Sequence, residues 1–375
     1  MTAKLMASHA IDRQIEKIGV SMKMRFLATG IGSMPFKDPE QAVDVSLSRV
    51  VNAPFWPQLP QRAFNEKMEV QYSEGIPCIV IDPKKERLYF DTSIDYYDEF
   101  AEFYEAYMAA MDPETGNGDC ASMAITPEFS KGIYAMEKRL RPLGRKLPFV
   151  KVQTTGPCSF ALTVVDENKR AIYYNEEFRE VVIKTLAMKC RWQIQKFQPF
   201  ADQVICFVDE PILSAFGSST YVSLKREDVV SHLAEVIAAI HADGAIAGIH
   251  CCGNTEWSIL VDAGVDIINF DAYGYGETVA MYPDALRKHL QRGGMLAYGI
   301  IPTSKAIREE SIKSLEDRLE GLIDQLASKG IDRQLIVEQT LLTPSCGTGL
   351  LEPEDALRVC DPLDQLSKAM REKYQ

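Results

Sequence analysis

The sequence predicts an α/β fold, a single (β/α)8 barrel of the TIM type. Short apolar or β-branched runs alternate with longer amphipathic segments, which is the pattern of parallel strands joined by helices. Eight such runs can be counted, the number that a closed barrel requires. No internal repeat, low-complexity tract or Pro/Gly/Ser-rich linker divides the 375 residues, so we expect one domain spanning 1–375.

The expected strands are short and rich in apolar and β-branched residues. They lie at 26–31, 52–56, 148–154, 204–209, 245–250, 265–270, 295–300 and 334–339. Four longer segments have the apolar periodicity of helices, at 38–51, 176–197, 226–244 and 311–330. Gly244 and Gly330 close the last two, where a helix C-cap is expected.

Two segments extend the barrel. Residues 1–24 have scattered charges and are expected to form a helical extension in front of the domain. Residues 75–147 do not fit one βα unit and follow the second strand as an insertion. This insertion contains a predicted hairpin around Pro83-Lys84-Lys85 and helical stretches near 94–111 and 127–141. We expect it to cover the barrel mouth.

Composition narrows the class of protein. Hydrophobic residues make up 46% of the chain and charged residues 25%, as in ordinary globular proteins. The formal charge of -12, with no Lys/Arg-rich run, argues against nucleic-acid binding. No apolar segment approaches the ~20 residues of a membrane helix, and the N-terminus lacks the apolar region of a secretory signal. Nine irregularly spaced cysteines indicate a reducing, cytoplasmic location.

A candidate metal site lies at the predicted strand ends, where barrel enzymes place their catalytic groups. In "GIHCCGNTEW", 248–257, His250 and Cys252 are two apart, so in extended chain both point to one face and Cys251 points to the other. Imidazole and thiolate suit zinc, and Cys346 in a glycine-rich loop supplies the third ligand. Asp271 is a possible oxygen ligand. Simple packing, or a strained disulfide between Cys251 and Cys252, are the alternatives.

Weaker signals follow the other strands. In "FVDEPI", Asp209 and Glu210 face opposite sides, so at most one enters the barrel mouth; an N-cap for the next helix is the alternative. "GIGSMP" allows backbone N–H groups to approach an anion such as a carboxylate, with Ser33 as a further donor. "TTGP" is equally compatible with a simple turn at Gly156.

Taken together, these motifs resemble a known family. "IGSMP", "TTGPCS", "VDEP", "HCCGN" followed by Asp271, and "TPSCG" occur in the order seen in the catalytic barrel of cobalamin-independent methionine synthase. That superfamily also contains uroporphyrinogen decarboxylase and the methylcobamide:coenzyme M methyltransferases. The resemblance runs from about residue 26 to the C-terminal helix.

The resemblance implies a zinc site and an amino-acid site. His250, Cys252 and Cys346 correspond to zinc ligands, and Asp271 stands in place of the family's glutamate ligand, although its side chain is shorter. The remaining implied residues contact the substrate homocysteine. Ile31, Gly32 and Ser33 hold its carboxylate, Asp209 binds its ammonium group, and Glu66 or Glu69 contacts the same amino group.

Two departures from the family shift the expected methyl donor. The chain has room for only one of the two barrels of full-length methionine synthase, and "HCCGNT" is closer to the corrinoid-linked methyltransferases. The sequence therefore predicts an S-methyltransferase with Zn²⁺ that methylates homocysteine, using methylcobalamin or a methylated corrinoid protein as donor and partner. The alternatives are a coenzyme M-type methyltransferase acting on another thiol, a metal-free decarboxylase of the uroporphyrinogen type, and a non-enzymatic zinc- or corrinoid-handling module.

Overall fold

The protein is described by a computed structural model covering residues 24–111, 118, 120–221 and 223–375. The expected helical extension therefore lies outside the described residues, apart from Met24. At the centre is a curled sheet of six parallel strands in the order β3-β5-β6-β7-β8-β9. Their bounds are Leu147–Thr155, Ala201–Asp209, Ile246–Cys251, Ile267–Phe270, Met295–Ile301 and Thr340–Pro344.

The predicted closed barrel of eight strands is wrong in its first two strands. Within the described residues, segment 26–31 contributes one bridge, Ala28 to Leu342, and segment 52–56 contributes one, Phe55 to Lys151. Between these two segments, the Thr29 hydroxyl donates to the Ala53 carbonyl at 2.8 Å. Prolines on either side of "FW", at 54 and 57, cannot donate hydrogen bonds to a sheet ladder. The sheet is consequently a six-stranded half-barrel, compatible with a TIM-like fold, with two short segments beside its edges.

The predicted last strand is also misplaced. Residues 334–339 belong largely to helix α13 (Arg333–Glu338), and the strand is β9, which begins at Thr340. The Asp332 side chain accepts a hydrogen bond from the Gln334 N–H at 3.0 Å and so caps the helix. A short apolar run such as "QLIV" fits a strand or a buried helix equally well, which explains the error.

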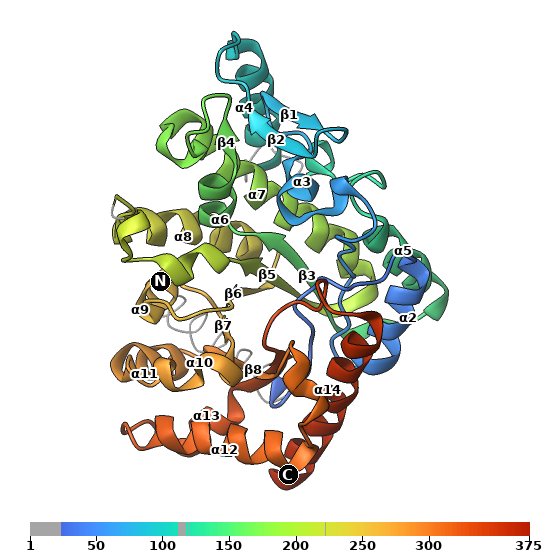
Figure 1. The fold of residues 1–375 in the computed structure, drawn as a ribbon, viewed down its shortest axis with the longest axis vertical. Helices are drawn as coiled ribbons and strands as arrows, with labels where there is room; N and C mark the ends of the chain where they lie inside the picture. The colour runs from blue at the N-terminus through green and yellow to red at the C-terminus, as the bar shows by residue number, and fades with distance from the viewer. Residues whose placement is uncertain (1–23, 112–117, 119, 222) are drawn as a thin grey trace, which may run out of the picture.

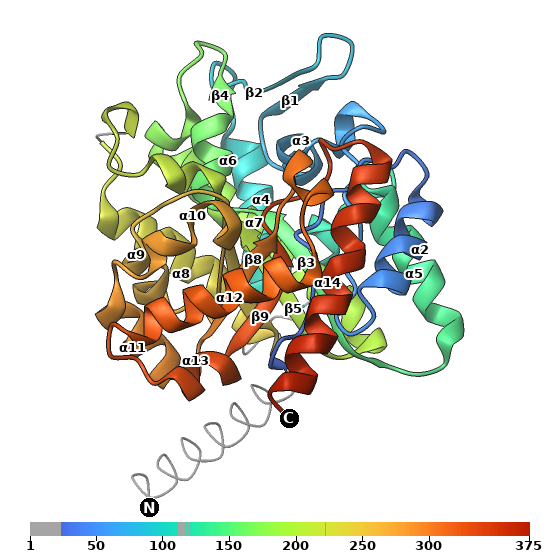
Figure 2. The ribbon, with the colours of Figure 1, turned by 60° about the horizontal axis from the view of Figure 1, so that its bottom comes forward.

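The four long predicted helices are confirmed. They are α2 (Pro39–Arg49), α7 (Glu176–Phe197), α8 (Arg226–Ala242) and α12 (Ile312–Ala327). Gly244 and Gly330, just past two of these ends, have φ of +70° and +85°, which glycine adopts without strain. Helices lie outside the curled sheet, with α7 against β3 and β5, α8 against β6 and α12 against β8 (Figures 1 and 2).

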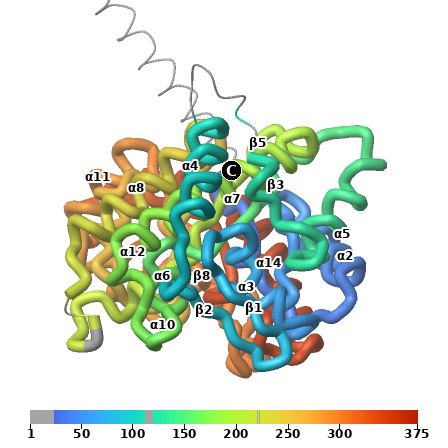
Figure 3. The backbone as a smooth tube through the Cα atoms, turned by 90° about the horizontal axis from the view of Figure 1, so that it is seen from above, coloured from blue at the N-terminus to red at the C-terminus, as the bar shows by residue number. Residues whose placement is uncertain are grey.

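The insertion 75–147 contains a hairpin and two helices that pack in different places. Its predicted hairpin is confirmed as β1 (Ile79–Asp82) paired with β2 (Arg87–Phe90), and β2 continues into a second sheet with β4 (Val165–Asp166). The two predicted helices are α4 (Tyr97–Met111) and α5 (Lys131–Leu140). Helix α4 packs on α7 and α5 packs on α2, in separate parts of the molecule (Figure 3).

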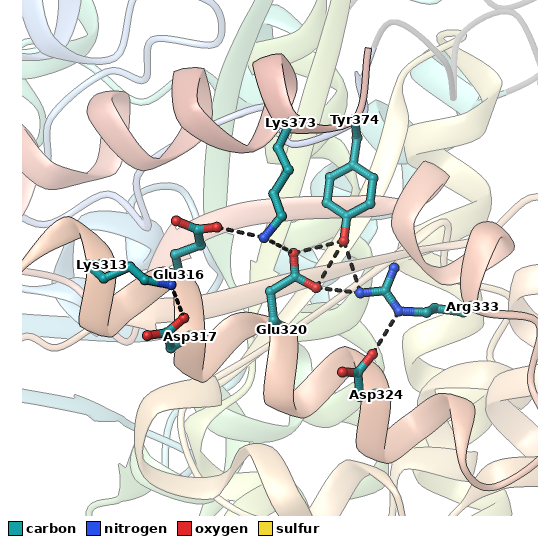
Figure 4. A network of polar contacts seen from close by, with 8 residues as sticks. All are labelled: Lys313, Glu316, Asp317, Glu320, Asp324, Arg333, Lys373 and Tyr374. Carbon is teal, nitrogen blue, oxygen red and sulfur yellow. Dashed lines mark hydrogen bonds and ion pairs between the residues drawn. The ribbon is translucent and has the colours of Figure 1, made fainter.

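The C-terminal helix α14 (Pro353–Lys373) packs on the last strand, β9, and also contacts the segment 26–31. Ser367 donates from its hydroxyl to the Phe26 carbonyl at 2.6 Å, and the ring of Tyr374 lies 5.5 Å from that of Phe26. A network of polar side chains, here called the C-terminal clamp, connects the end of α14 to α12 and α13 (Figure 4). Its members are Lys313, Glu316, Asp317, Glu320, Asp324, Arg333, Lys373 and Tyr374.

The remaining helices follow the strand ends. They are α3 (Met68–Ser73), α6 (Pro157–Thr163), α9 (Trp257–Asp262), α10 (Ala272–Val279) and α11 (Pro283–Gln291), with 3-10 turns that include η1 (Phe64–Glu66) and η6 (Pro211–Ala215). Within the part of the chain that the structure describes, none of the helices has the length and apolarity needed to span a bilayer.

Candidate metal centre and adjoining cavity

Three predicted ligands come together at the carboxyl end of the sheet. His250 lies in β6, Cys252 follows that strand directly, and Cys346 follows β9. One ligand atom from each side chain lies within 4.8 Å of the other two. Because β7 and β8 separate β6 from β9 in the sheet, only its curl brings the two cysteines together. The cluster can hold a metal ion such as zinc.

The orientation of His250 fits a metal ligand. Its Nδ1 lies 2.6 Å from Oδ1 of Asn269 on the neighbouring strand. The Asn269 amide nitrogen donates to the Ala297 carbonyl and to the Thr343 hydroxyl, both at 2.8 Å, which fixes the amide with its oxygen towards His250. Nδ1 therefore carries the proton. Nε2 is buried and has no hydrogen-bond partner, so its lone pair is directed to the cluster.

Cys252 and Cys346 shift each other's pKa in opposite directions. The Cys346 thiol, and then the neighbouring His250 imidazole, lowers the pKa of Cys252 to about 4. The same contact with Cys252, together with burial, raises the pKa of Cys346 far above its ordinary value. Burial opposes the protonation of His250, but Cys252 and Asp209 outweigh it and raise the pKa of His250. A thiolate held in this way attracts a cation.

A cavity of about 220 Å³ adjoins the cluster. All three cluster residues line it, together with Ile31, Ser33, Glu66 and Asp209. Gly32, the third residue expected to hold a carboxylate, is not part of this lining. Among the described residues that form it there is no lysine or arginine. No residue of 75–147 belongs to it either, and the covering role expected for the insertion stays a prediction.

Two buried carboxylates in the cavity have an oxygen without a partner. Asp209 ends β5; its Oδ1 accepts no hydrogen bond, and burial raises its pKa to about 6 against the opposing effects of His250 and Lys151. Oε1 of Glu66 lies 2.6 Å from the Arg62 guanidinium, while Oε2 has no partner. Burial raises the pKa of Glu66 as well. Buried acceptors are normally satisfied, so this pair is suited to a cationic hydrogen-bond donor.

Ser33 connects the first and last loops of the site. Its carbonyl accepts from the backbone N–H and the hydroxyl of Thr348, at 2.9 and 3.0 Å. Its hydroxyl accepts from the Gly349 N–H at 3.2 Å. A Cβ at Gly347 would lie 2.1 Å from the Ser33 hydroxyl oxygen, so only glycine allows this approach. The contacts place Ser33 beside the loop that carries Cys346.

Glu210 is a structural residue. Its carboxylate accepts from the N–H groups of Cys158 and Ser159 at 2.9 and 2.8 Å, and from the Ser159 hydroxyl at 2.7 Å. It therefore caps α6, and the expected capping of its own following helix is not the arrangement found. A Cβ at Gly156 would lie 2.1 Å from the Glu210 carboxyl carbon, which explains the glycine in "TTGP". Burial raises the pKa of Glu210 to about 7.

The other predicted residues lie around the cluster. Asp271 caps α10 by accepting from the Gly274 N–H at 2.7 Å and is outside the group of three ligand atoms. Burial raises its pKa, with a smaller effect of Cys252, and direct ligation by Asp271 stays a prediction. Cys251 is a free thiol, so the disulfide with Cys252 is absent; it is buried, 3.6 Å from the Gly253 carbonyl. Glu69 lies in α3, outside the cavity lining.

Lys151 was not predicted as a site residue from the sequence. This fully buried β3 lysine donates from Nζ to the Ile31 carbonyl and to Oε1 of Gln153, the latter at 3.0 Å. The Phe207 ring lies 4.8 Å from Nζ, and burial lowers the pKa of Lys151 to about 8. Lys151 fixes the backbone of the loop that bears Ser33. A lysine within the otherwise apolar run "PFVKV" was the available signal.

Comparison with known proteins shows a likeness of fold to solved structures. No protein-family model matches the sequence, and no curated protein does. A solved structure, described as a methyltransferase from Methanosarcina mazei, is similar over 90% of this chain and 87% of its own, with 13% identity and a TM-score of 0.50. At this identity the likeness concerns the fold, and it supports a TIM-like arrangement of the half-barrel.

Proposed function

We propose that the protein is a zinc-dependent thiol methyltransferase that methylates homocysteine, with a methylated corrinoid as donor. The observation that carries this proposal is the composition of one cavity. Three soft ligands converge on it, and two buried carboxylate oxygens without partners, Asp209 Oδ1 and Glu66 Oε2, belong to residues of the same lining.

The donor set of the cluster suits zinc. One imidazole and two thiol groups are a combination that zinc accepts in a tetrahedral site, and three protein ligands leave the fourth position for a substrate. Zinc bound there supplies the positive charge that lowers the pKa of a substrate thiol and keeps it as thiolate near neutral pH. Asn269 contributes by holding the His250 ring in the tautomer that leaves Nε2 available.

The cavity favours an amino-acid thiol as acceptor. Asp209 and Glu66 receive the ammonium group, since both carry an unpaired buried oxygen. In this proposal Ser33 and the backbone at Ile31, which line the cavity, bind the carboxylate, and Lys151 holds that backbone. Fixing the ammonium and carboxylate groups, which are both attached to the α-carbon, directs the side-chain sulfur to the cluster. Orientation of this kind is a large contribution to the rate of a two-substrate reaction.

The transfer itself is a nucleophilic substitution at a methyl carbon. The thiolate sulfur donates an electron pair to that carbon and forms the new S–C bond. The bond between the methyl carbon and the donor breaks, and its electron pair stays with the donor. The proton of the thiol is released when the thiolate forms. A methyltransferase of similar fold is consistent with this chemistry by analogy.

The alternatives fit the cavity less well. Coenzyme M carries a sulfonate and a decarboxylase of the uroporphyrinogen type binds several carboxylates, so each needs basic groups. The described lining offers two carboxylates and neither lysine nor arginine. A zinc- or corrinoid-handling module would not need unpaired carboxylates beside the ligands.

Zinc analysis and methylation assays test the proposal. Protein purified without chelator should contain about one zinc per chain, as a single three-ligand site predicts. It should form methionine from homocysteine with methylcobalamin, and methyltetrahydrofolate is tested in parallel. Activity with coenzyme M and none with homocysteine would reject the acceptor. Full activity of protein without zinc would reject the metal.

A further inference from the structure

Gln58 is one of the residues that line the cavity. It follows the segment 52–56 and is buried. Its backbone forms a parallel bridge with Ser33. The Gln58 N–H donates to the Gly32 carbonyl at 3.0 Å, and the Met34 N–H donates to the Gln58 carbonyl at 2.9 Å. Gln58 is therefore held against the loop to which the proposed function assigns the substrate carboxylate.

The side-chain amide of Gln58 has a fixed orientation. Its Nε2 donates to Oε1 of Gln71 at 2.9 Å and to the Tyr72 hydroxyl at 3.3 Å. Nε2 of Gln71 donates to the Phe129 carbonyl at 2.8 Å, and a carbonyl only accepts, so Gln71 must turn its oxygen to Gln58. The Tyr72 hydroxyl donates its one proton to the Gln153 carbonyl at 2.7 Å and is left to accept from Gln58. Both neighbours therefore require the amide nitrogen of Gln58 on their side.

The oxygen of the same amide is left for the cavity. Within the part of the chain that the structure describes, no group donates to Oε1 of Gln58. Asp209 Oδ1 and Glu66 Oε2 are fully enclosed without a partner, whereas Gln58 Oε1 is not enclosed. Because Gln58 is otherwise buried and lines the cavity, the open space that this oxygen touches is the cavity.

Three acceptors from separate elements thus belong to one lining. Gln58 follows the segment 52–56, Glu66 lies in η1 and Asp209 ends β5. A primary ammonium group has three N–H donors, and each needs an acceptor when it is buried. The two carboxylate oxygens satisfy two of these donors and leave the third. A substrate without the amine leaves all three acceptors unpaired, which opposes its binding.

We infer that Gln58 is a specificity-determining residue, whose amide oxygen is the third acceptor for a primary ammonium group on the substrate. The inference rests on the proposed function for the place of that group at Asp209 and Glu66. An amino acid carries its ammonium and carboxylate groups on one carbon. Gln58 meets this requirement, since its backbone pairs with Ser33 and its oxygen faces the cavity. Gln71 is a positioning residue, because it lies outside the described lining and acts by holding the Gln58 amide.

Two thiols that differ only in the ammonium group test the inference. Homocysteine has this group, and 4-mercaptobutanoate is the same molecule without it. The affinity of each is measured by calorimetry on the protein as purified, without a methyl donor. The wild-type protein should bind homocysteine about 100-fold more tightly than 4-mercaptobutanoate, since several hydrogen bonds to a charged group are lost together. Equal affinities of the two thiols would overturn the inference.

Substitution of Gln58 tests its share in this discrimination. Gln58→Met keeps the length of the side chain and removes the acceptor. The ratio of the two affinities should fall about tenfold, the loss expected for one hydrogen bond to a charged group. Zinc content should stay unchanged, because Gln58 is outside the group of ligands. A purely structural effect would weaken the binding of both thiols equally and leave the ratio as it is.

Two further variants complete the test. Gln71→Met lets the Gln58 amide turn and should lower the ratio about threefold, also where Gln58→Met does not fold. The matched control is Gln61→Met, because Gln61 donates to the Gly349 carbonyl at 2.8 Å and lies outside the described lining. An unchanged ratio in the variants that fold, or an equal fall in the control, contradicts the role of Gln58.

Binding without a methyl donor separates this inference from the proposed function. If the protein transfers no methyl group but its preference for homocysteine depends on Gln58, the function fails and Gln58 remains a contact of the ammonium group. If methionine forms normally while Gln58→Met leaves the ratio of affinities unchanged, the function holds and Gln58 takes no part in recognition.

Discussion

Polar groups are paired in the C-terminal clamp, whereas some are unpaired in the cavity that adjoins the cluster of His250, Cys252 and Cys346. In the clamp, Glu320 accepts from the Tyr374 hydroxyl at 2.7 Å and pairs with Lys373 and Arg333, all partly exposed. In the cavity, Asp209 and Glu66 are buried, yet each keeps an oxygen without a partner. Burying an unsatisfied acceptor costs stability, whereas a paired surface network costs little. Polar groups in the clamp therefore hold helices together, and those in the cavity are available to a ligand.

The strongest test of this contrast is removal of a metal ligand. Cys252→Ser should lose zinc and reduce methyl transfer by more than about 100-fold, because a missing ligand has a larger effect than a changed supporting residue. Cys251→Ser is the matched control, since Cys251 is buried away from the cluster and should keep both properties. Zinc is measured by mass spectrometry of the purified protein. Loss of zinc in the control, with retention in Cys252→Ser, would exchange the roles of the two cysteines.

Asp209→Asn tests the unpaired carboxylates. Under the proposed function, the substitution removes the charge assigned to the substrate ammonium group and should raise the KM for homocysteine about 30-fold, corresponding to about 2 kcal/mol for a charged hydrogen bond. Zinc content should stay constant, because Asp209 is not among the three ligands. The control is Asp317→Asn in the clamp, where the carboxylate is 61% exposed and pairs with Lys313. An unchanged KM in Asp209→Asn would contradict the assignment.

Asn269→Ala tests how the histidine is oriented. Without the amide oxygen, Nδ1 loses its partner and the ring can rotate or change tautomer. Zinc affinity, measured by competition with a chelating dye, should fall about tenfold or more, as for other supporting residues of metal sites. Thr343→Val is a milder variant, since it removes one of the two acceptors that hold Asn269 in place. Equal affinity in all three proteins would show that packing alone orients His250.

The clamp should respond to pH and leave the chemistry intact. Burial opposes the ionisation of Glu320, but Lys373 and Tyr374 outweigh it, so its pKa is lowered. A lowered folded-state pKa gives stability that is present above the ordinary value of 4.5 and is lost as the pH falls through the lowered one. Glu320→Gln should therefore cost about 1 kcal/mol at pH 7. Urea unfolding should show a smaller difference near pH 3, and methyl transfer at pH 7 should be unchanged.

The features that could be predicted from the sequence are those that depend on the spacing of residues close together in the chain. His250 and Cys252 at a strand end, and the helices with clear apolar periodicity, needed no knowledge of distant contacts. The first two strands could not be judged in this way, because strand pairing depends on donors supplied from elsewhere in the chain. In the described residues each of the two segments makes a single bridge to the sheet, and in the second segment Pro54 and Pro57 cannot donate to a sheet ladder. The apolar run before Thr340 was ambiguous because a short apolar run fits a strand or a buried helix equally well.

The cluster of His250, Cys252 and Cys346 could be predicted from the sequence, and the residues that support it less so. Thiol and imidazole groups are chemically conspicuous, whereas Asn269 and Lys151 act through one or two hydrogen bonds that only the folded sheet creates. Glu210 agrees with the expectation that at most one of the two adjacent carboxylates enters the site, since Asp209 lines the cavity and Glu210 caps a neighbouring helix.

The tie between Ser33 and the loop after β9 also bears on the order of assembly during translation. His250 and Cys252 leave the ribosome well before Cys346. Ser33 can form its hydrogen bonds with Thr348 and Gly349 only after those two residues have also been made. A nascent chain that ends before β9 therefore presents only two of the three ligands. Full metal retention should consequently be among the last properties that the newly made protein acquires, after most of the sheet has formed.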